Sequence, residues 1–167
     1  FGARLMGLDK PEVERRIALA DAATRAMRQT SFEERAEWMR AGADLLEAEA
    51  DEVAVILTTE MGKPLAQAKA EALKCVKGMR FYAQHAAEFL ADEPLADPSA
   101  VNASQAYAVY QPLGAVLAVM PWNYPLWQVV RFAAPALMAG NSGLLKHASN
   151  VPQSALYLDT LFERGGF

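Results

Sequence analysis

The sequence predicts an α/β protein in which amino-terminal helices lead into a Rossmann-like parallel β-sheet, and three observations support this. Most of residues 1–94 place apolar side chains at helical spacing. Residues 114–120 are apolar throughout, which is typical of a strand covered on both faces. A helical stretch separates them from the short apolar run 143–146, and strand–helix–strand is the crossover unit of such sheets.

The first two predicted helices carry recognisable start signals. Pro11 lies just inside the start of the first helix, where the N–H group that proline lacks would have no helical partner. Ser31 and Glu34 form a capping-box pattern, with Ser31 as the N-cap and Glu34 three residues later. An apolar stripe at helical spacing follows, so the second helix is predicted to begin after Ser31.

The next two helices are predicted from the residues that open and close them. Asp51 opens the third helix, and Gly62 ends it as a C-cap residue because glycine adopts the left-handed conformation easily. Pro64 occupies the first turn of a long fourth helix, which continues to Leu90. The charged side chains of these helices are interpreted as solvated faces.

Turns and short segments dominate the middle of the chain. Residues 94–99 contain two prolines and an aspartate, a combination that marks a turn, and residues 106–110 are expected to form a strand. A helix of about 15 residues follows the apolar run 114–120. Pro152 begins the last helix, and the two glycines at 165–166 end it.

Composition excludes several classes of function. The net charge of −4 argues against a nucleic-acid partner, and no apolar run reaches the roughly 20 residues that span a bilayer. Residues 1–5 lack the features of a signal peptide, so a cytoplasmic location is expected. Cys75 is the single cysteine, and only His85 and His147 accompany it, so neither an internal disulfide nor a zinc site is expected.

An asparagine between two prolines is the most unusual feature of the predicted strand-to-helix crossover. Asn123 lies two residues after Pro121 and two before Pro125. Its uncharged amide carries two N–H donors, which can hold a developing oxyanion. The alternative is that Asn123 caps the following helix, because asparagine is a favoured N-cap residue. The spacing alone leaves both interpretations open.

These motifs resemble the amino-terminal part of the aldehyde dehydrogenase superfamily. The similar segments are, in the family's order, residues 60–64 (EMGKP), 121–125 (PWNYP), 134–141 (APALMAGN) and 144–146 (LLK). Residues 146–150 (KHASN) resemble the NADP-type, actinobacterial members of its succinate-semialdehyde dehydrogenase branch. The resemblance implies oxidation of succinate semialdehyde to succinate, with NADP as the cofactor and NAD as the alternative. The implied substrate is a small aldehyde that carries a carboxylate.

The reaction implied by the resemblance needs a cysteine thiolate that attacks the aldehyde and a glutamate that activates water. The family carries both residues beyond the position of Phe167, so this chain is interpreted as the first third of a longer enzyme and is expected to be inactive alone. Cys75 lies in the middle of a predicted helix and is interpreted as a packing or surface residue. Two alternatives remain: an aldehyde dehydrogenase of another substrate class, or a truncated, non-catalytic interaction or assembly module.

The resemblance implies roles for residues at both strand ends. Asn123 corresponds to the side-chain donor of the oxyanion hole and is also expected to be a cofactor-binding residue. The backbone of Trp122 corresponds to the nicotinamide–ribose contact, with an aromatic core anchor as the alternative. Lys146 ends the second strand, and its cation suits ribose hydroxyls or phosphate, although it could also be a lysine extending into solvent. NAD-preferring relatives usually carry Glu at the position of Ser149, so the resemblance implies NADP; otherwise Ser149 caps the next turn.

The remaining cofactor-side residues are His147 and Ala148, which are expected to form the loop on the adenosine side. His147 is assigned no catalytic role, and a general base is the alternative. Helical spacing puts four residues on one face, and the resemblance implies that this face lines the aldehyde tunnel: Tyr124, Trp127, Gln128 and Arg131. Arg131 is the predicted partner of the substrate carboxylate, unless it pairs with an acid elsewhere in the protein.

Three segments follow from these interpretations. Residues 1–94 form the helical part of a cofactor-binding domain, and residues 95–113 are a connecting or oligomerisation segment with strand character. Residues 114–167 contain the first strand–helix–strand units of that domain, and the catalytic domain is absent from the chain. A homo-oligomer is implied by the resemblance alone.

Overall fold

The computed structural model describes residues 9–167, so residues 1–5, on which the signal-peptide interpretation depends, lie outside the described part. The elements are α1 (Lys10–Met27), α2 (Phe32–Ala48), α3 (Ala50–Met61), α4 (Leu65–Phe89), β1 (Glu93–Pro94), the 3-10 helix η1 (Pro98–Val101), β2 (Tyr107–Ala108), β3 (Ala115–Val119), α5 (Trp127–Met138), β4 (Ser142–Lys146) and α6 (Pro152–Gly165). None of the described helices combines the length and the apolar character that crossing a bilayer requires.

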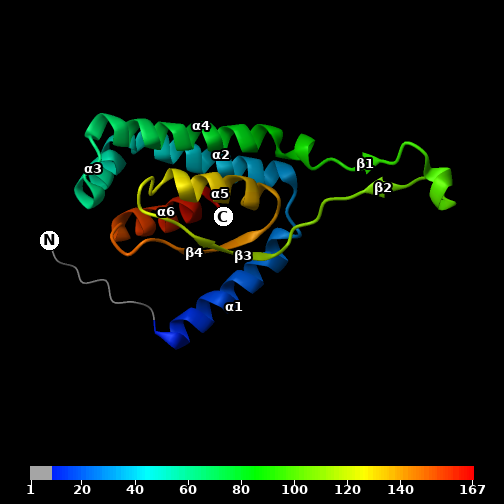
Figure 1. Ribbon diagram of the computed structural model, residues 1–167, viewed down its shortest axis with the longest axis horizontal. Helices are drawn as coiled ribbons and strands as arrows, with labels where there is room; N and C mark the ends of the chain where they lie inside the picture. Colours follow the sequence, from blue (N-terminus) through cyan, green and yellow to red (C-terminus); the bar gives the residue numbers. More distant parts are fainter. Residues whose placement is uncertain (1–8) are drawn as a thin grey trace.

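The elements are arranged in layers around a small parallel sheet (Figure 1). Helices α2 and α4 pack together, α5 and α6 lie between them and strands β3 and β4, and α1 crosses the opposite face of the strands. The core lies mainly between the helices. Its largest fully buried apolar side chains include Met39, Leu46, Leu57, Met79, Leu126, Val130, Leu158 and Leu161.

The parallel pairing of β3 with β4 confirms the predicted crossover. Ala115 pairs with Ser142 at one end, and Val119 pairs with Lys146 at the other. The expectation that β3 is covered on both faces is wrong for the described residues, because Leu117 is 64% exposed and Val119 is 65% exposed. Alternate residues of a strand point to opposite faces, so Leu117 and Val119 lie on the same face of the sheet as Ser142. Helix α1 covers this face only near the start of the strands.

Most predicted helix boundaries agree with the structure. The Ser31 hydroxyl accepts from the Glu34 amide at 3.1 Å, and the Glu34 carboxylate accepts from the Ser31 amide at 2.7 Å, so the capping box is confirmed. The bond from the Ser31 amide, together with one from the Ser31 hydroxyl to the same carboxylate, lowers the pKa of Glu34 below its usual value. Gly62 has φ 74° and ends α3 as predicted. Pro64 lies one residue before α4 rather than in its first turn, and α3 begins one residue before Asp51.

Residues 95–113 form an extended arm rather than a full strand. Only Tyr107 and Ala108 of the predicted strand pair with another strand, β1, in antiparallel orientation. Figure 1 shows this part of the chain projecting away from the helical layers. Apolar side chains on the arm are exposed, and they include Leu95, Val101, Tyr107, Val109 and Leu113. The oligomerisation role of the arm stays a prediction.

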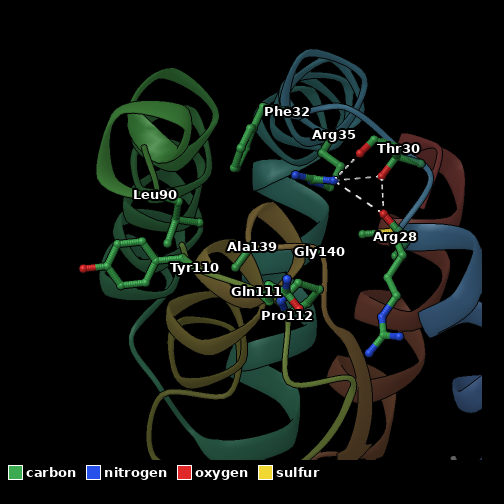
Figure 2. Close-up of a pocket in the computed structure, with 11 residues that line it drawn as sticks. Arg28, Thr30, Phe32, Arg35, Leu90, Tyr110, Gln111, Pro112, Ala139 and Gly140 are labelled. Carbon is green, nitrogen blue, oxygen red and sulfur yellow. Dashed lines mark hydrogen bonds between the residues drawn. The ribbon is translucent and has the colours of Figure 1, made fainter. Parts of the chain in front are cut away.

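Arg35 ties the start of α2 to the end of α5. Its guanidinium is buried and donates from Nε to the Met138 carbonyl oxygen at 3.0 Å. Nη1 donates to the carbonyl oxygen of Thr30 at 2.6 Å and to its hydroxyl at 2.9 Å, and the group lies 4.6 Å from the Phe32 ring centroid. Burial lowers the pKa of Arg35. Figure 2 shows Arg35 in the wall of a hollow of about 380 Å³.

We expect Arg35→Ala to lower the free energy of unfolding by about 2–4 kcal/mol, because it leaves the carbonyl groups of Met138 and Thr30 without their donors. The measurement is urea denaturation followed by circular dichroism. Arg40→Ala is the matched control: Arg40 is an exposed arginine of the same helix that pairs with Glu33, so its loss costs no more than about 1 kcal/mol. Equal losses for the two variants would contradict this role of Arg35.

Candidate functional site at the carboxyl ends of the two strands

The carboxyl ends of β3 and β4 bring the two predicted site segments together. The amide of Met120 donates to the carbonyl oxygen of Lys146 at 3.1 Å, so the strands stay paired to their last residues. Farther along, a hydrogen bond of 2.8 Å joins Nε2 of His147 to the carbonyl oxygen of Pro125. The segment after β3 therefore lies beside the segment after β4, at the edge where α/β proteins commonly bind ligands.

His147 joins the two segments through both of its ring nitrogens. The Ala148 amide donates to Nδ1 at 2.8 Å, so Nδ1 is an acceptor and the proton lies on Nε2. That N–H group donates to Pro125. Both ring nitrogens are thus engaged with the backbone. This arrangement leaves no free nitrogen for a general base and agrees with the interpretation of His147 as a loop residue.

Asn123 does not cap the following helix. Helix α5 begins at Trp127, and its N-cap residue is Leu126, whose side chain makes no capping hydrogen bond. The interpretation of Asn123 as a cap is therefore wrong, because the helix begins too far along the chain. Asn123 is exposed, and its amide makes no hydrogen bond to any residue between 9 and 167. Both N–H donors of the amide remain available to a ligand.

Glu71 of α4 caps α5 instead. Its Oε1 accepts from the backbone amides of Leu126 and Trp127, each at 3.0 Å. Its other oxygen, Oε2, forms an ion pair with Lys63, and the two side chains are 1% and 7% exposed respectively. Nζ of Lys63 also lies 3.8 Å from the ring centroid of Tyr124 and 3.4 Å from the carbonyl oxygen of Asn123. This buried pair therefore contacts the segment that carries Asn123.

A second glutamate performs the same role at α6. Glu60, near the end of α3, accepts from the Gln153 amide, from the Ser154 amide at 3.0 Å and from the Ser154 hydroxyl at 2.7 Å. The amides at a helix N-terminus often bind phosphate groups. In this chain Glu60 and Glu71 already accept from amides in the first turns of α6 and α5. An anionic ligand must therefore be held mainly by other groups.

Sequence reasoning missed these glutamates and Lys63. One signal was available: Glu71 lies three residues after Ala68 and four before Cys75, which are both buried on α4. A charged residue in an apolar stripe needs a partner, since an unpaired buried charge is costly. Glu60 and Lys63 lie in the segment 60–64, which sequence reasoning used only for the resemblance. Nothing in the local pattern indicated that their partners lie in the first turn of α6 and in α4.

Lys146 and Ser149 present free polar groups at the end of β4. Both are exposed, and within residues 9–167 neither side chain takes part in an ion pair or a hydrogen bond. The Ser149 hydroxyl forms no hydrogen bond within the described residues, so the alternative that Ser149 caps the next turn finds no support there. Ala148 between them is partly buried. The segment therefore offers a cation and a hydroxyl group to a ligand.

The aromatic residues of the site lie in different surroundings. Trp122 is 50% exposed, so it is not a core anchor within the described part of the chain. Tyr124 lies in the turn before α5, and not on the predicted helical face, because the helix begins only at Trp127. Trp127 is partly buried against α4, where Nζ of Lys74 lies 4.1 Å from its ring centroid. A Cβ at Gly78 would lie 3.2 Å from the same ring, so a larger residue there would require the ring to shift by a few tenths of an ångström.

The rest of the predicted face follows α5. Gln128 is partly buried. Its backbone amide donates to the Tyr124 carbonyl oxygen at 3.0 Å, and this bond joins the turn to the helix. Arg131 is exposed and forms no ion pair with a described residue, so the alternative that it pairs with an acid finds no partner between residues 9 and 167. Arg131 thus carries an uncompensated positive charge in the described part of the chain.

Cys75 is confirmed as a packing residue. Its side chain is fully buried on α4. Burial raises the pKa of the thiol, and the nearby negative charge of Glu71 raises it further. A thiol of this kind is a poor nucleophile because the thiolate is the reactive form. Within residues 9–167, no three or more His, Cys, Asp or Glu side chains are grouped to hold a metal ion.

The two described hollows lie away from these residues. The hollow beside Arg35 is at the other end of the strands, with Pro112, Ala139 and Gly140 in its wall. A second, mainly apolar hollow of about 600 Å³ lies between α1, α5 and α6. Neither is lined by Asn123 or Lys146. Asn123, Lys146 and Ser149 are all exposed, so these residues lie at an open edge of the sheet.

Comparison with known proteins relates this chain to one family. Residues 3–167 match the model of the aldehyde dehydrogenase family. The chain is 67% identical over 156 residues to succinate-semialdehyde dehydrogenase [NADP(+)] 1 of Mycobacterium tuberculosis, and covers 34% of that protein. It is 66% identical over 156 residues to an aldehyde dehydrogenase of Paenarthrobacter nicotinovorans, of which it also covers 34%. Each match takes in 93% of this chain.

The structure gives the same result. It superposes on the crystal structure of succinic semialdehyde dehydrogenase from Streptococcus pyogenes, a complex with NADP+, with a TM-score of 0.89 and 34% sequence identity. The match covers 98% of this chain and 36% of the other. The predicted α/β class is confirmed, and the chain has the helical and Rossmann-like part of the same fold. It spans about a third of the length of the relatives that it matches.

Proposed function

Because this chain belongs to the aldehyde dehydrogenase family, we propose that it supplies the oxyanion donor and part of the cofactor site of an NADP-preferring succinate-semialdehyde dehydrogenase. The observation that carries the proposal is the pairing of β3 with β4, which brings the Asn123 and Ser149 segments to one edge of the sheet. Both segments carry exposed polar groups there. The relatives' names support the choice of substrate and cofactor.

Asn123 acts on the reacting oxygen of the aldehyde. A cysteine thiolate, which the family resemblance assigns to a position outside residues 1–167, attacks the carbonyl carbon, and negative charge develops on the carbonyl oxygen. The Asn123 amide donates an N–H bond to that oxygen and stabilises it without taking its charge. The exposed amide is suited to this role because no described residue competes for its donors. Residues 1–167 alone, with only the buried Cys75, are expected to be inactive.

The residues at the end of β4 fit a nucleotide cofactor. The donors available there, the Lys146 ammonium and the Ser149 hydroxyl, suit ribose hydroxyls and a ribose phosphate. We propose that these two residues, with the backbone at Trp122, His147 and Ala148, hold NADP. When bound, the cofactor accepts the electrons of the aldehyde oxidation. Ser149 carries no negative charge, whereas a glutamate in its place would repel the ribose phosphate.

Arg131 is proposed to bind the carboxylate of the substrate. It lies one turn into α5, roughly 6 Å along the helix axis from Trp127, and its side chain is exposed. The planar guanidinium of arginine binds a carboxylate through two hydrogen bonds. Helical side chains also lean toward the N-terminus, which here is the end nearest Asn123. The geometry thus suits a short substrate with an aldehyde at one end and a carboxylate at the other.

In the complete enzyme, we expect Asn123→Ala to lower kcat by about a hundredfold or more, because one oxyanion donor is lost. Asn123→Asp should be at least as slow, since its carboxylate keeps the shape of the side chain but has no N–H to donate. The measurement is the rate of aldehyde oxidation in a single turnover, with circular dichroism to confirm folding. An unchanged rate in both variants would remove Asn123 from the oxyanion site.

We expect Ser149→Glu to shift the preference from NADP toward NAD, because the new carboxylate repels the ribose phosphate and can accept bonds from ribose hydroxyls. The measurement is the Kd of each cofactor by titration. Ser149→Ala separates the two effects, since it removes the hydroxyl group without adding a charge and should weaken NADP binding only. Equal Kd values for NADP and NAD in the unaltered enzyme would contradict the proposed cofactor.

We expect Arg131→Ala to raise KM for succinate semialdehyde tenfold or more, which corresponds to losing a charged hydrogen bond of ~1.5–3 kcal/mol. Butanal serves as the control substrate because it has the same chain length and no carboxylate, and its KM should change far less. The comparison is made on the complete enzyme by steady-state kinetics. Equal losses for the two substrates would assign Arg131 to structure and leave the aldehyde class unspecified.

A further inference from the structure

We propose that Glu71, held by Lys63, is a positioning residue that fixes the place of the Asn123 amide. The proposal rests on the oxyanion role proposed for Asn123. Glu71 is about 50 residues away in sequence and forms no hydrogen bond with Asn123; it acts through the backbone amides of Leu126 and Trp127. Lys63 orients the carboxylate and contacts the turn itself, at the Asn123 carbonyl oxygen.

The turn between β3 and α5 depends on bonds from outside. Met120 pairs with the end of β4 before the turn, and regular helical bonding begins with Gln128 after it. Between these points, side chains of other elements contact the backbone: His147 binds the carbonyl oxygen of Pro125, and Lys63 approaches the carbonyl oxygen of Asn123. Glu71 fixes the far end of the turn at Leu126. The place of Asn123 is thus set by three side chains from two other segments.

The chemistry of the pair favours positioning over stability as its role. A buried ion pair often contributes little net stability, because removing two charges from water costs about as much as their attraction returns. The Lys63–Glu71 pair is nevertheless almost completely buried. What it supplies is a fixed, charged acceptor for two amides at the positive end of a helix. Such charge-assisted bonds are roughly twice as strong as bonds between neutral groups.

Two charge-matched variants of the complete enzyme test the proposal. Lys63→Met/Glu71→Gln removes both charges but keeps an oxygen that can accept from the Leu126 and Trp127 amides. Lys63→Met/Glu71→Leu removes the same charges and provides no acceptor. Neither variant leaves an unpaired buried charge, so both should fold. We expect single-turnover aldehyde oxidation to be at least tenfold slower in the Leu variant than in the Gln variant, with the Kd of NADP within twofold in both.

The same comparison in an Asn123→Ala background tests whether the effect passes through Asn123. We expect the difference between the Leu and Gln variants to fall to twofold or less, because no amide remains to be positioned. A purely structural role would leave the difference unchanged. Amide hydrogen exchange provides a readout that needs no substrate: the peptide containing Leu126 and Trp127 should exchange faster in the Leu variant than in the Gln variant.

Cys75→Ala is the control for general loosening of α4. Cys75 is buried one turn after Glu71 on the same helix, and its substitution should lower Tm without slowing oxidation. The proposal is overturned if the Leu and Gln variants oxidise aldehyde at equal rates, or if their difference persists without Asn123. A different pattern marks failure of the proposed function: Asn123→Ala by itself would then leave the rate unchanged, and Glu71 would have no oxyanion donor to position.

Discussion

Helix α5 is held at both ends by buried charged side chains of opposite sign, and the rest of the structure depends on this arrangement. The Glu71 carboxylate accepts from amides at its N-terminus, and the Arg35 guanidinium donates to the Met138 carbonyl oxygen at its C-terminus. Both complement the helix dipole, which is positive at the first end and negative at the second. Because only a short turn joins β3 to α5, fixing the start of the helix also fixes one end of the connection that carries the candidate site.

The same constraint explains why the corner between α3 and α4 matters. The first amides of a helix lack partners within the helix, and where they are buried they need acceptors from elsewhere. Glu60 and Glu71, at this one corner, supply acceptors to the two helices that follow the paired strands. The helical layers therefore set the geometry at the sheet edge, although none of the residues proposed to contact substrate or cofactor lies on α3 or α4.

The parts of the fold that depend on local chemistry could be predicted from sequence. Ser31 and Glu34 satisfy each other within one turn, and Gly62 needs only its own left-handed conformation. The Glu71 contacts could not be predicted in this way, because their partners lie about 55 residues away and backbone amides leave no sequence signature. The exposure of Leu117 was missed for a related reason. An apolar strand predicts that both of its faces are buried, but it does not show which part of the protein buries them.

The site residues divide along the same line. The resemblance identified Asn123, Lys146 and Ser149 by type, and the structure shows that their segments meet and that these side chains have no partner among residues 9–167. These side chains are available because other residues make the structural hydrogen bonds. Glu71 accepts from amides at the start of α5, Glu60 accepts from amides at the start of α6, and His147 joins the two loops. A polar side chain that caps a helix uses its hydrogen-bonding groups there, so it cannot also bind a reacting oxygen or a phosphate. Because Glu60 and Glu71 from the corner between α3 and α4 cap these helices, the polar residues at the sheet edge remain available to ligands.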